Sequence, residues 1–441
     1  MDDPSLATSN MSKLHKILTK HFGTNPAFYP IIEQSYEIYQ RANLHVAIED
    51  LVKSTGSDVE LHGIVSAEDY TLVSLAKIAQ PKLGKWIQQG PIEYVDEPIS
   101  NDARLSCVKR GLFLFGYNDQ AVALLLTDKP HRSNLVYAEV MAATKQIAEL
   151  LGHHLAKLVR YGTVLRGQVI SPSKDCYGNT SIKFQNLPTI DRSQVILPDE
   201  VLKRIERQTI GFSENSNRLA AAGRHLKRGI LLHGPPGTGK TFTAMYLASR
   251  MPGRTVFLLT ATSFGSIETA CKMARILEPS TVILEDVDLI GAQRETQVVD
   301  ANAILFELLN QMDGLSNDAD ILFVLTTNRP DVLEHALAAR PGRVDQAIEI
   351  PLPDADCRRR LFDLYSHGLK LEVKRPEEVI KKIEGVSAAF IRELLRKSAV
   401  FAAIEMPNEI IVRDKHIQDA LGDLLIEGGP LTKSLLGAKT N

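Results

Sequence analysis

The feature that most constrains the fold of this 441-residue chain is a glycine-rich loop between an expected strand and an expected helix. Residues 228–233 form a short apolar run typical of a buried parallel strand, and residues 242–249 carry apolar side chains at helical spacing. The loop between them follows the pattern G-x-x-x-x-G-K-T. Its residues are Gly234, Pro235, Pro236, Gly237, Thr238, Gly239, Lys240 and Thr241.

A strand, a glycine turn and a helix N-terminus in this order are suited to binding phosphate. The helix N-terminus directs backbone N–H groups and the positive end of its dipole at phosphate oxygens. The glycines allow backbone angles and a close approach that a Cβ would prevent. We expect Lys240 to reach the β- and γ-phosphates and the Thr241 hydroxyl to be a ligand of Mg²⁺. The sequence therefore predicts a nucleoside triphosphate site.

Composition indicates a soluble intracellular protein of several domains. The net charge of −2 gives no global attraction to nucleic acid or to an anionic membrane. No C-x-x-C pair occurs, which argues against a disulfide framework or a cysteine zinc site. The cysteines are Cys107, Cys176, Cys271 and Cys357. The start of the chain lacks the pattern of a secretory signal, and no apolar stretch has the length of a membrane helix, so we predict a cytoplasmic protein.

The first part of the chain predicts a separate α+β domain over residues 1–165. We expect helices within residues 11–56, including one that covers residues 31–39. Residues 111–115 and 121–126 predict two strands of a hairpin, joined by a turn at 116–120. A later helix is expected to have one apolar face, made of Ile147, Leu150, Leu151, Leu155, Leu158 and Val159.

A polar stretch at 171–179 predicts a linker over residues 166–195. From residue 195 onward helical and strand-like segments alternate, as expected for a parallel sheet covered by helices. Within it, residues 281–284 form a mostly β-branched apolar run that ends in Glu285, Asp286 and, two residues on, Asp288. Ligands bind at the carboxyl edge of such sheets. One carboxylate there can hold Mg²⁺ and its neighbour can orient or deprotonate an attacking water.

These motifs, together with several others in the same order, resemble the AAA branch of the AAA+ ATPases over roughly residues 195–425. Residues 234–241 match its Walker A motif, residues 284–288 with Arg294 match Walker B, and residues 308–315 match the helix and turn that follow. Residues 326–331 match sensor 1, residues 340–354 the second region of homology, and residues 385–390 a lid segment.

The resemblance implies a P-loop NTPase fold with ATP and Mg²⁺ as cofactors. It implies a large α/β domain over 196–353, a small helical lid over 354–427 and a C-terminal tail over 428–441. It also gives Asn328 the role of sensing the γ-phosphate. Arg340 and Arg343 are implied to be arginine fingers that reach the nucleotide of a neighbouring subunit, so the expected assembly is a ring of six subunits.

Two departures from the family pattern bear on activity. Walker B in this family reads Asp-Glu, but here the order is inverted to Glu285 and Asp286. By position Glu285 takes the metal role and Asp286 the water-polarising role; the alternative is a weakened or inactive ATPase. The family's pore loop carries an aromatic side chain that grips substrate, and only Phe264 stands at a comparable place. Phe264 is either that pore residue or an apolar loop residue packed beneath its own subunit.

The predicted function is that of an ATP hydrolase that remodels or unfolds proteins, with a substrate or adaptor recruited by residues 1–165. The lack of a basic excess argues against nucleic acid as partner, and no membrane partner is expected. The pattern H-E-x-x-H is absent, which argues against a fused zinc protease. Two alternatives are a motor or loader that acts on nucleic acid and a nucleotide-gated scaffold with little turnover.

Overall fold

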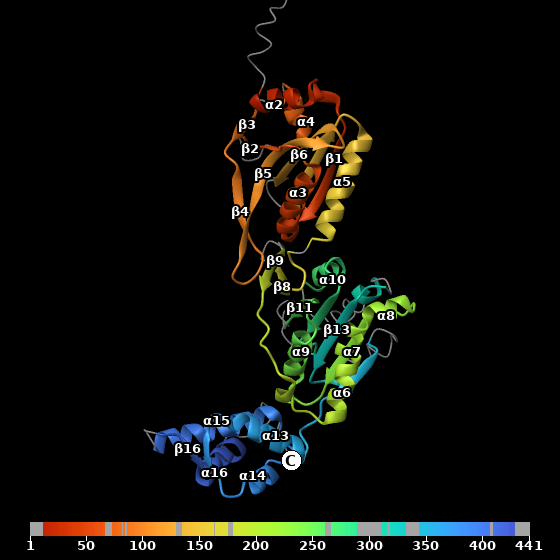
Figure 1. Ribbon diagram of the computed structural model, residues 1–441. Helices are drawn as coiled ribbons and strands as arrows, with labels where there is room; N and C mark the ends of the chain where they lie inside the picture. Colours follow the sequence, from red (N-terminus) through yellow and green to blue (C-terminus); the bar gives the residue numbers. More distant parts are fainter. Residues whose placement is uncertain are drawn as a thin grey trace, which may run out of the picture. The chain divides into compact units, whose positions relative to one another are not determined.

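The computed structural model describes residues 12–66, 73–81, 83, 86–128, 135–162, 164–174, 180–260, 266–288, 310–314, 318–331, 344–405 and 409–427 (Figure 1). The chain divides into two compact units. The first contains Met1–Gln168 and Ser173–Phe184, and the second contains Val169–Pro172 and Gln185–Asn441. Each unit has its own sheet and its own apolar clusters.

The first unit is built on an antiparallel sheet in which seven strands are described, in the order β1-β7-β6-β5-β2-β3 with β4 paired to β5. The strands in chain order are β1 (Ile31–Glu37), β2 (Glu60–Ser66), β3 (Ile87–Gly90), β4 (Glu93–Pro98), β5 (Arg104–Tyr117), β6 (Gln120–Asp128) and β7 (Leu135–Ala142). Side chains alternate across a strand. In β6, Val122 and Leu124 therefore join one apolar cluster while Ala123 and Leu125 join another.

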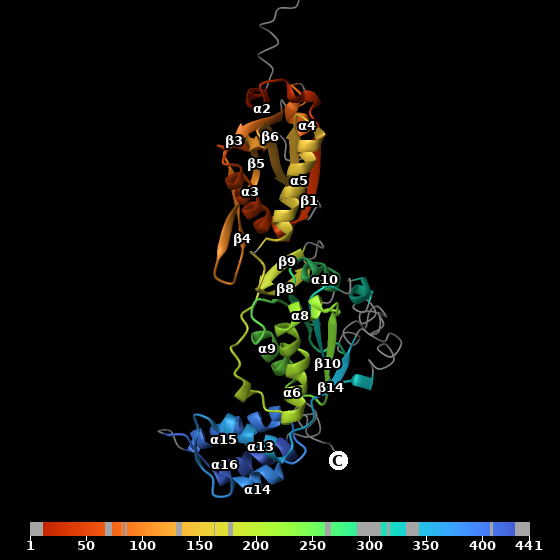
Figure 2. The ribbon, with the colours of Figure 1, turned by 45° about the vertical axis from the view of Figure 1, so that its right-hand side comes forward.

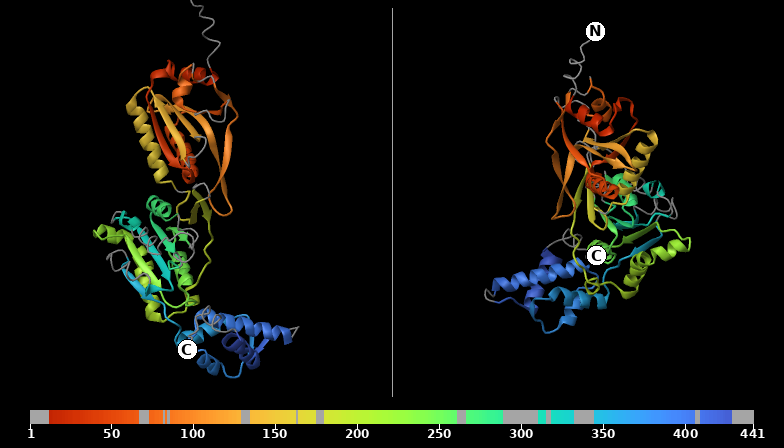
Figure 3. Two further views of the ribbon diagram at one scale, coloured as in Figure 1. Left: turned by 180° about the vertical axis from the view of Figure 1, so that it is seen from behind. Right: turned by 45° about the horizontal axis from the view of Figure 1, so that its top comes forward.

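Helices cover both faces of this sheet (Figures 2 and 3). The cluster on one face includes side chains of α3 (Arg41–Thr55) and α5 (Lys145–Arg160). The cluster on the other face includes side chains of α2 (Lys13–Phe22) and α4 (Leu75–Ala79). Short 3₁₀ segments are η1 (Pro26–Phe28), η2 (Ile38–Gln40) and, in the second unit, η4 (Arg192–Gln194). The first unit is thus an α+β domain, as predicted.

The helix predicted over residues 31–39 is wrong, because this segment is mainly strand β1. Ile31 pairs with Met141 and Glu37 with Leu135 along β7, so sheet pairing overrides the helical spacing of the apolar residues. The predicted hairpin is confirmed, with a tighter turn than expected. Only Asn118 and Asp119 connect β5 and β6, with φ of 49° and 59°, the left-handed conformation that a two-residue hairpin favours.

The expected helix in the 147–159 region is α5, and Leu151, Leu155 and Val159 are buried on its inner face. Leu150, predicted on the same face, is 46% exposed. Residues 166–195, predicted as a linker, contain strands β8 (Val169–Lys174) and β9 (Thr180–Phe184). The Gln185 N–H donates to the Val169 carbonyl at 2.9 Å, which closes this segment on itself.

The second unit contains a parallel sheet with the order β14-β10-β13-β12-β11-β8. Its strands are β10 (Arg228–His233), β11 (Thr255–Leu259), β12 (Ser280–Leu284), β13 (Ile321–Thr327) and β14 (Gln346–Glu349), beside β8. The accompanying helices are α6 (Asp199–Gln208), α7 (Ile210–Glu214), α8 (Ser216–Ala221), α9 (Lys240–Ser249) and α10 (Ile267–Ile276). This architecture confirms the α/β fold that the alternating pattern predicted.

The lid region is mostly helical. It contains α13 (Ala355–Ser366), α14 (Pro376–Lys382), α15 (Ala388–Glu405), α16 (Asp414–Gly422) and the π-helical turn η7 (Asp423–Glu427) around one apolar cluster. Strands β15 (Lys370–Glu372) and β16 (Ile411–Arg413) pair in parallel beside these helices, which the sequence did not predict. Among the described residues, no helix combines the length and the apolar character that crossing a bilayer requires.

Candidate nucleotide site

The glycine-rich loop leaves β10 at the carboxyl edge of the parallel sheet and enters α9. Gly234 has a φ of 148°, and a Cβ at this position would lie 2.2 Å from the Ile350 carbonyl oxygen. The Ile350 N–H donates to the His233 carbonyl at 2.7 Å, which holds the two segments at this close approach. Only glycine therefore fits at the start of the loop.

The middle of the loop contacts the lid. The Ala389 N–H at the start of α15 donates to the Gly237 carbonyl at 3.0 Å. A Cβ on Gly237, where φ is 75°, would lie 2.8 Å from the Ser387 hydroxyl oxygen and 2.9 Å from the Ala389 Cβ. Residue 237 must therefore be small both for its backbone angle and for the lid to pack against it.

The loop ends at the N-terminus of α9. Gly239, with a φ of 98°, is the N-cap, and the helix begins at Lys240. The Thr238 hydroxyl donates to the Pro235 carbonyl at 2.9 Å and braces the loop from within. Thr241 lies in the first turn of the helix and is exposed. The helix dipole thus places positive potential at the end of the loop, as an anion site requires.

Lys240 is 95% buried, since 5% of its surface is exposed. Its ammonium donates to the carbonyls of Gly234 at 2.9 Å and Pro235 at 2.8 Å. Burial lowers the pKa of Lys240 to about 8, and the nearby carboxylates of Asp286 and Asp288 oppose that shift. The hydrogen bonds of the ammonium thus go to two carbonyls of its own loop, while the charges of Asp286 and Asp288 act on it without a direct contact, an arrangement that a triphosphate would improve.

Glu285 follows β12 at the same edge of the sheet. Its N–H donates to the Leu259 carbonyl at 3.0 Å, which continues the sheet by one residue. Its side-chain Oε1 is buried and has no hydrogen-bond partner among the described residues. Burial, and then the neighbouring Asp286, raise the pKa of this carboxyl group. A buried oxygen that lacks a donor fits a cation ligand, so Glu285 is suited to hold Mg²⁺.

Asp286 contacts the residue predicted as sensor 1. Its Oδ1 accepts a hydrogen bond from the Asn328 side-chain amide at 3.2 Å, and its N–H donates to the Thr326 hydroxyl at 3.0 Å. Its φ of 48° is unusual for a residue other than glycine. Burial first, and Asp288 second, raise the pKa of Asp286, while Lys240 and Asn328 lower it. The structure therefore brings Asp286, Asn328 and Lys240 into one electrostatic cluster.

Asp288 is the residue of this site to which the sequence assigned no role. Its Oδ1 accepts hydrogen bonds from the Thr327 hydroxyl at 2.8 Å and from the Asn328 N–H at 3.1 Å. It therefore fixes the backbone of the segment that carries the Asn328 amide. The available signal was only that Asp288 is a third acidic residue directly after the strand that ends at Leu284.

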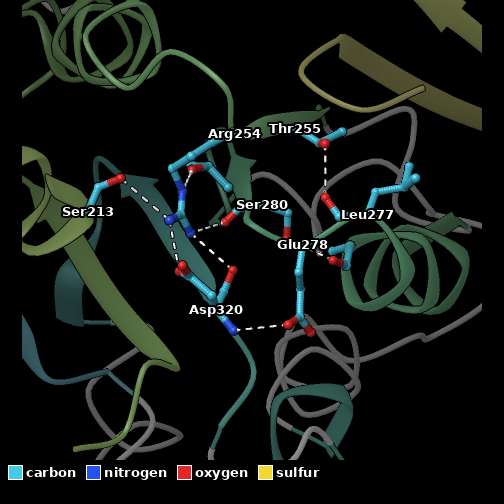
Figure 4. Close-up of polar contacts among 9 residues, drawn as sticks. Ser213, Arg254, Thr255, Leu277, Glu278, Ser280 and Asp320 are labelled. Atoms are coloured by element: carbon cyan, nitrogen blue, oxygen red, sulfur yellow. Dashed lines mark hydrogen bonds and ion pairs between the residues drawn. The ribbon is translucent and has the colours of Figure 1, made fainter. Parts of the chain in front are cut away.

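The amino edge of the same sheet carries a second polar cluster that the sequence did not reveal (Figure 4). Arg254 is 4% exposed and lies just before β11. Its guanidinium donates to the Asp320 carboxylate at 2.7 Å and to the Thr281 hydroxyl at 3.1 Å. It also donates to the Ser280 and Asp320 carbonyls and to the Ser213 hydroxyl. One arginine thus joins the starts of three neighbouring strands.

Four further residues that the sequence singled out lie outside the described part of the chain. They are Phe264, Arg294, Arg340 and Arg343. Their predicted roles as pore residue, trailing arginine of Walker B and arginine fingers stay predictions.

A parallel sheet, a phosphate loop that runs from β10 into a helix N-terminus, and carboxylates at the end of β12, which β13 separates from β10, define a P-loop nucleotide-binding domain. The model of the AAA family, "ATPase family associated with various cellular activities", matches residues 230–352. Residues 230–352 are therefore an AAA-family ATPase domain, as the resemblance implied.

Three relatives illustrate where the similarity lies. The chain is 31% identical over 279 residues to ATP-dependent zinc metalloprotease FtsH 3 of Symbiobacterium thermophilum, covering 58% of this chain and 44% of the relative. It is 32% identical over 245 residues to the FtsH protease of Mycoplasmopsis pulmonis, covering 52% and 33%. It is 29% identical over 273 residues to chloroplastic FTSH 1 of Oryza sativa, covering 58% and 39%. The chain thus spans less than half the length of these relatives.

Proposed function

We propose that this protein hydrolyses Mg-ATP and uses the energy to remodel or unfold other proteins. The observation that carries the proposal is the hydrogen bond between Asp286 and Asn328, which joins the two residues expected to act on water and on the γ-phosphate. Lys240 belongs to the same cluster, because Asp286 and Asp288 partly oppose the lowering of its pKa that burial causes. The similarity to FtsH-type ATPases supports the same reading.

In this proposal the loop binds the phosphates, and the residues at the strand ends act on Mg²⁺ and on the attacking water. Backbone N–H groups of residues 234–241 and the ammonium of Lys240 hold the phosphates. The Thr241 hydroxyl and the Glu285 carboxylate would hold Mg²⁺, which when bound neutralises charge on the phosphate oxygens. Asp286 accepts a proton from, or orients, the attacking water, and Asn328 keeps its carboxylate in place. Catalysis then rests on positioning and charge rather than on a covalent intermediate.

The unpartnered oxygen of Glu285 supports the assignment of the inverted acidic pair. Asp286 already uses its Oδ1 to accept from the Asn328 amide, so it could offer a metal only its other oxygen unless that hydrogen bond broke. Glu285 loses no hydrogen bond at Oε1 when it turns to a cation. The Glu285 side chain is thus suited to bind the metal, and the Asp286 side chain stays beside Asn328.

We further propose that activity requires a ring, expected to be a hexamer, in which Arg340 and Arg343 complete the site of the neighbouring subunit. An arginine supplied across an interface is worth about 10³–10⁵ in rate in comparable phosphoryl-transfer sites. ATP hydrolysis per subunit should therefore rise with protein concentration. Arg343→Ala should cripple turnover and spare ATP binding, and mixing it with Asp286→Asn should restore part of the activity.

The decisive experiment measures ATP binding and Mg²⁺-dependent hydrolysis for wild type, Lys240→Ala and a control, Lys203→Ala. Lys203 is an exposed lysine of α6 that pairs with Glu200. We expect Lys240→Ala to abolish ATP binding in a folded protein and the control to bind normally. Normal affinity in Lys240→Ala would refute the nucleotide site. Intact assembly with ATP but no turnover in wild type would instead show a nucleotide-gated scaffold, the reading that the inverted pair leaves open.

The remodelling half of the proposal has its own test. Asp286→Asn is expected to bind ATP without hydrolysing it and so to retain its substrates. Proteins that co-purify with this variant in the presence of ATP, and are released by wild-type turnover, would be the substrates. Retention of nucleic acid alone would point to a motor on nucleic acid instead.

A further inference from the structure

In the first unit, exposed lysine side chains and exposed apolar side chains come from elements that contact one another. Helix α2 contacts α4, η1 and β3, and α4 contacts η1; α2, α4 and β3 can be followed in Figure 2. We call the exposed side chains of these elements and of the residues between α4 and β3 the basic aromatic face. Its residues are Lys13, Lys16, Lys20, Phe28, Leu83 and Trp86.

The described residues of these elements and their connections carry charge of one sign. Residues 12–32, 73–81, 83 and 86–92 contain no aspartate or glutamate. They contain four lysines, which are Lys13, Lys16, Lys20 and Lys77. The chain as a whole has a net charge of −2, so these lysines are a local concentration rather than a general excess. A surface of one sign attracts ligands of the other sign over about one Debye length, roughly 8 Å at physiological salt.

Lysines 13, 16 and 20 follow the outer side of α2. Between them Leu14, His15 and Leu18 are buried against the sheet, and the His15 ring nitrogen Nδ1 lies 3.2 Å from the Ile78 carbonyl of α4. The register of the helix is thus fixed by its buried side. The three ammonium groups therefore stand on one exposed strip of a helix that cannot rotate.

Phe28 is the most exposed large apolar side chain among the described residues, at 96%. The turn that carries it is nevertheless well fixed. Pro26 is buried, the Asn25 side chain accepts from the Ala27 N–H at 3.1 Å, and Tyr29 packs edge-on against Phe22. Tyr29 also forms a hydroxyl–hydroxyl hydrogen bond with Thr24 at 2.5 Å.

An aromatic side chain on a fixed turn is pre-organised to bind, because little backbone entropy is lost when a partner covers it. Leu83 and Trp86, 52% and 49% exposed, extend the apolar character between α4 and β3. Aromatic anchors of this kind dominate the energetics of protein interfaces.

We propose that the basic aromatic face recruits acidic protein segments that also carry apolar side chains. This inference rests on the proposed remodelling function, which needs a site that captures substrate before it is pulled. The lysines would pair with the acidic side chains of the segment, and Phe28 and Trp86 would contact its apolar side chains. A short segment meets only this face, so the acidic remainder of the chain does not repel it.

The same observations favour a peptide over the two other polyanions. A single strand of nucleic acid is bound by aromatic side chains on which successive bases stack. Here one side chain, Phe28, is nearly fully exposed, and the described face includes only one other exposed aromatic side chain, Trp86. A membrane presents an extended negative plane to a chain whose net charge is −2. Both remain as competing outcomes of the experiment.

The test is fluorescence anisotropy on the full chain with a labelled peptide in which Glu and Asp alternate with Leu and Phe. Two companion probes replace its acidic residues with Lys or its apolar residues with Ser. We expect the first peptide to bind, with an affinity that falls as salt rises, and both companions to bind at least about tenfold more weakly. Equal binding of all three peptides, or no binding of the first at low salt, would overturn the proposal.

The variants locate the site. Phe28→Ala and the triple change of Lys13, Lys16 and Lys20 to Glu should each weaken binding about tenfold or more. The controls are Tyr161→Ala, an aromatic residue 61% exposed after α5, and the triple change of Lys53, Lys145 and Lys157 to Glu on α3 and α5. Thermal unfolding checks that each variant is folded. An equal loss of peptide affinity in the variants and the controls would show that the peptide does not bind at the basic aromatic face.

Two further probes decide the class of partner. A single-stranded oligothymidine and vesicles of phosphatidylserine with phosphatidylcholine are titrated under the same conditions. Binding of either probe that is tighter than that of the acidic peptide and lost in Phe28→Ala would replace the proposal. ATP hydrolysis by wild type is measured separately. Its absence, with peptide binding that depends on the face, would refute the proposed ATPase function and leave the recruiting surface standing.

Discussion

The two edges of one parallel sheet differ in how far their buried charged side chains are hydrogen-bonded by the protein itself. At the amino edge the Arg254 guanidinium meets Asp320, two carbonyls and two hydroxyls, and its nitrogens donate from all three positions. At the carboxyl edge no described residue donates to Oε1 of Glu285, and burial disfavours the charged forms of Lys240, Glu285 and Asp286. The fold depends on both partners of a buried charge pair, because removing one leaves the other uncompensated, whereas a buried charge left unpaired is available to a ligand.

Asp286→Asn should have the largest effect on chemistry and almost none on stability. The amide keeps the size of the side chain but loses the acceptor that the water needs, so single-turnover hydrolysis should fall about 10²–10⁴-fold while Mg-ATP still binds. The matched variant at the other edge is Asp320→Asn, which should lower stability and leave the rate per folded molecule nearly unchanged. If Glu285→Gln traps ATP and Asp286→Asn loses metal affinity, the two roles are exchanged.

Arg254→Met should have the largest effect on stability. Removing one member of a buried pair leaves Asp320 without its partner, which costs about 3–5 kcal/mol in the free energy of unfolding. Arg250→Met, at an exposed arginine that follows α9, should stay within about 0.5 kcal/mol. Urea denaturation of the three proteins measures the difference. Equal stability of the two variants would show that the contacts of Arg254 at the amino edge do not contribute to the free energy of unfolding.

Asp288→Ala should have an intermediate effect that appears in kcat more than in KM. It frees the Thr327 hydroxyl and the Asn328 N–H, so the amide beside Asp286 loses its fixed position. We expect kcat to fall about tenfold, the scale of one hydrogen bond to a charged group. A double-mutant cycle with Thr327→Val should give a coupling of at least about 0.5 kcal/mol. Asp331→Ala, at an exposed position of the same segment, serves as the control.

Of these predictions, the smallest change in a measured quantity is the change in the free energy of unfolding caused by Glu285→Gln. The sign of this change tests whether the carboxyl edge leaves its charge unpaired. Without nucleotide it should raise the free energy of unfolding by about 1 kcal/mol, because it removes a buried charge that no donor compensates. Saturating Mg-ATP should remove this advantage, since the wild-type carboxylate then meets its cation. Denaturation midpoints with and without Mg-ATP test both statements. A loss of stability in the nucleotide-free variant would show that Glu285 already has a partner in the fold.

The carboxyl edge could be predicted from the sequence because its signals are local. The loop at 234–241 and the acidic run after residue 284 are each contiguous, and strand direction alone places both at one edge. The contact between Asp286 and Asn328 spans 42 residues and was not predicted, because the family resemblance gave each residue a role at the nucleotide but no contact between them. The sequence thus located the site, and the structure showed how its residues pair.

The amino edge could not be predicted, because its partners are far apart in the sequence. Arg254 meets Thr281, Ser213 and Asp320, at separations of 27, 41 and 66 residues. The same limit explains the error at residues 31–37. Ile31, Ile32 and Tyr36 fit either a helix or a strand, and only pairing with β7 decides between them.

The hydrogen bond between Gly237 and Ala389 ties the N-terminal end of helix α15 to the phosphate loop, so a movement of the loop can tilt the helix. The helix is 18 residues long and begins beside this contact, so it has a length of about 27 Å. A tilt of about 10° at the loop would carry its far end through roughly 5 Å, by the geometry of a rod of that length. A shift of the loop too small to alter its own contacts would thus become a displacement large enough to move a neighbouring molecule.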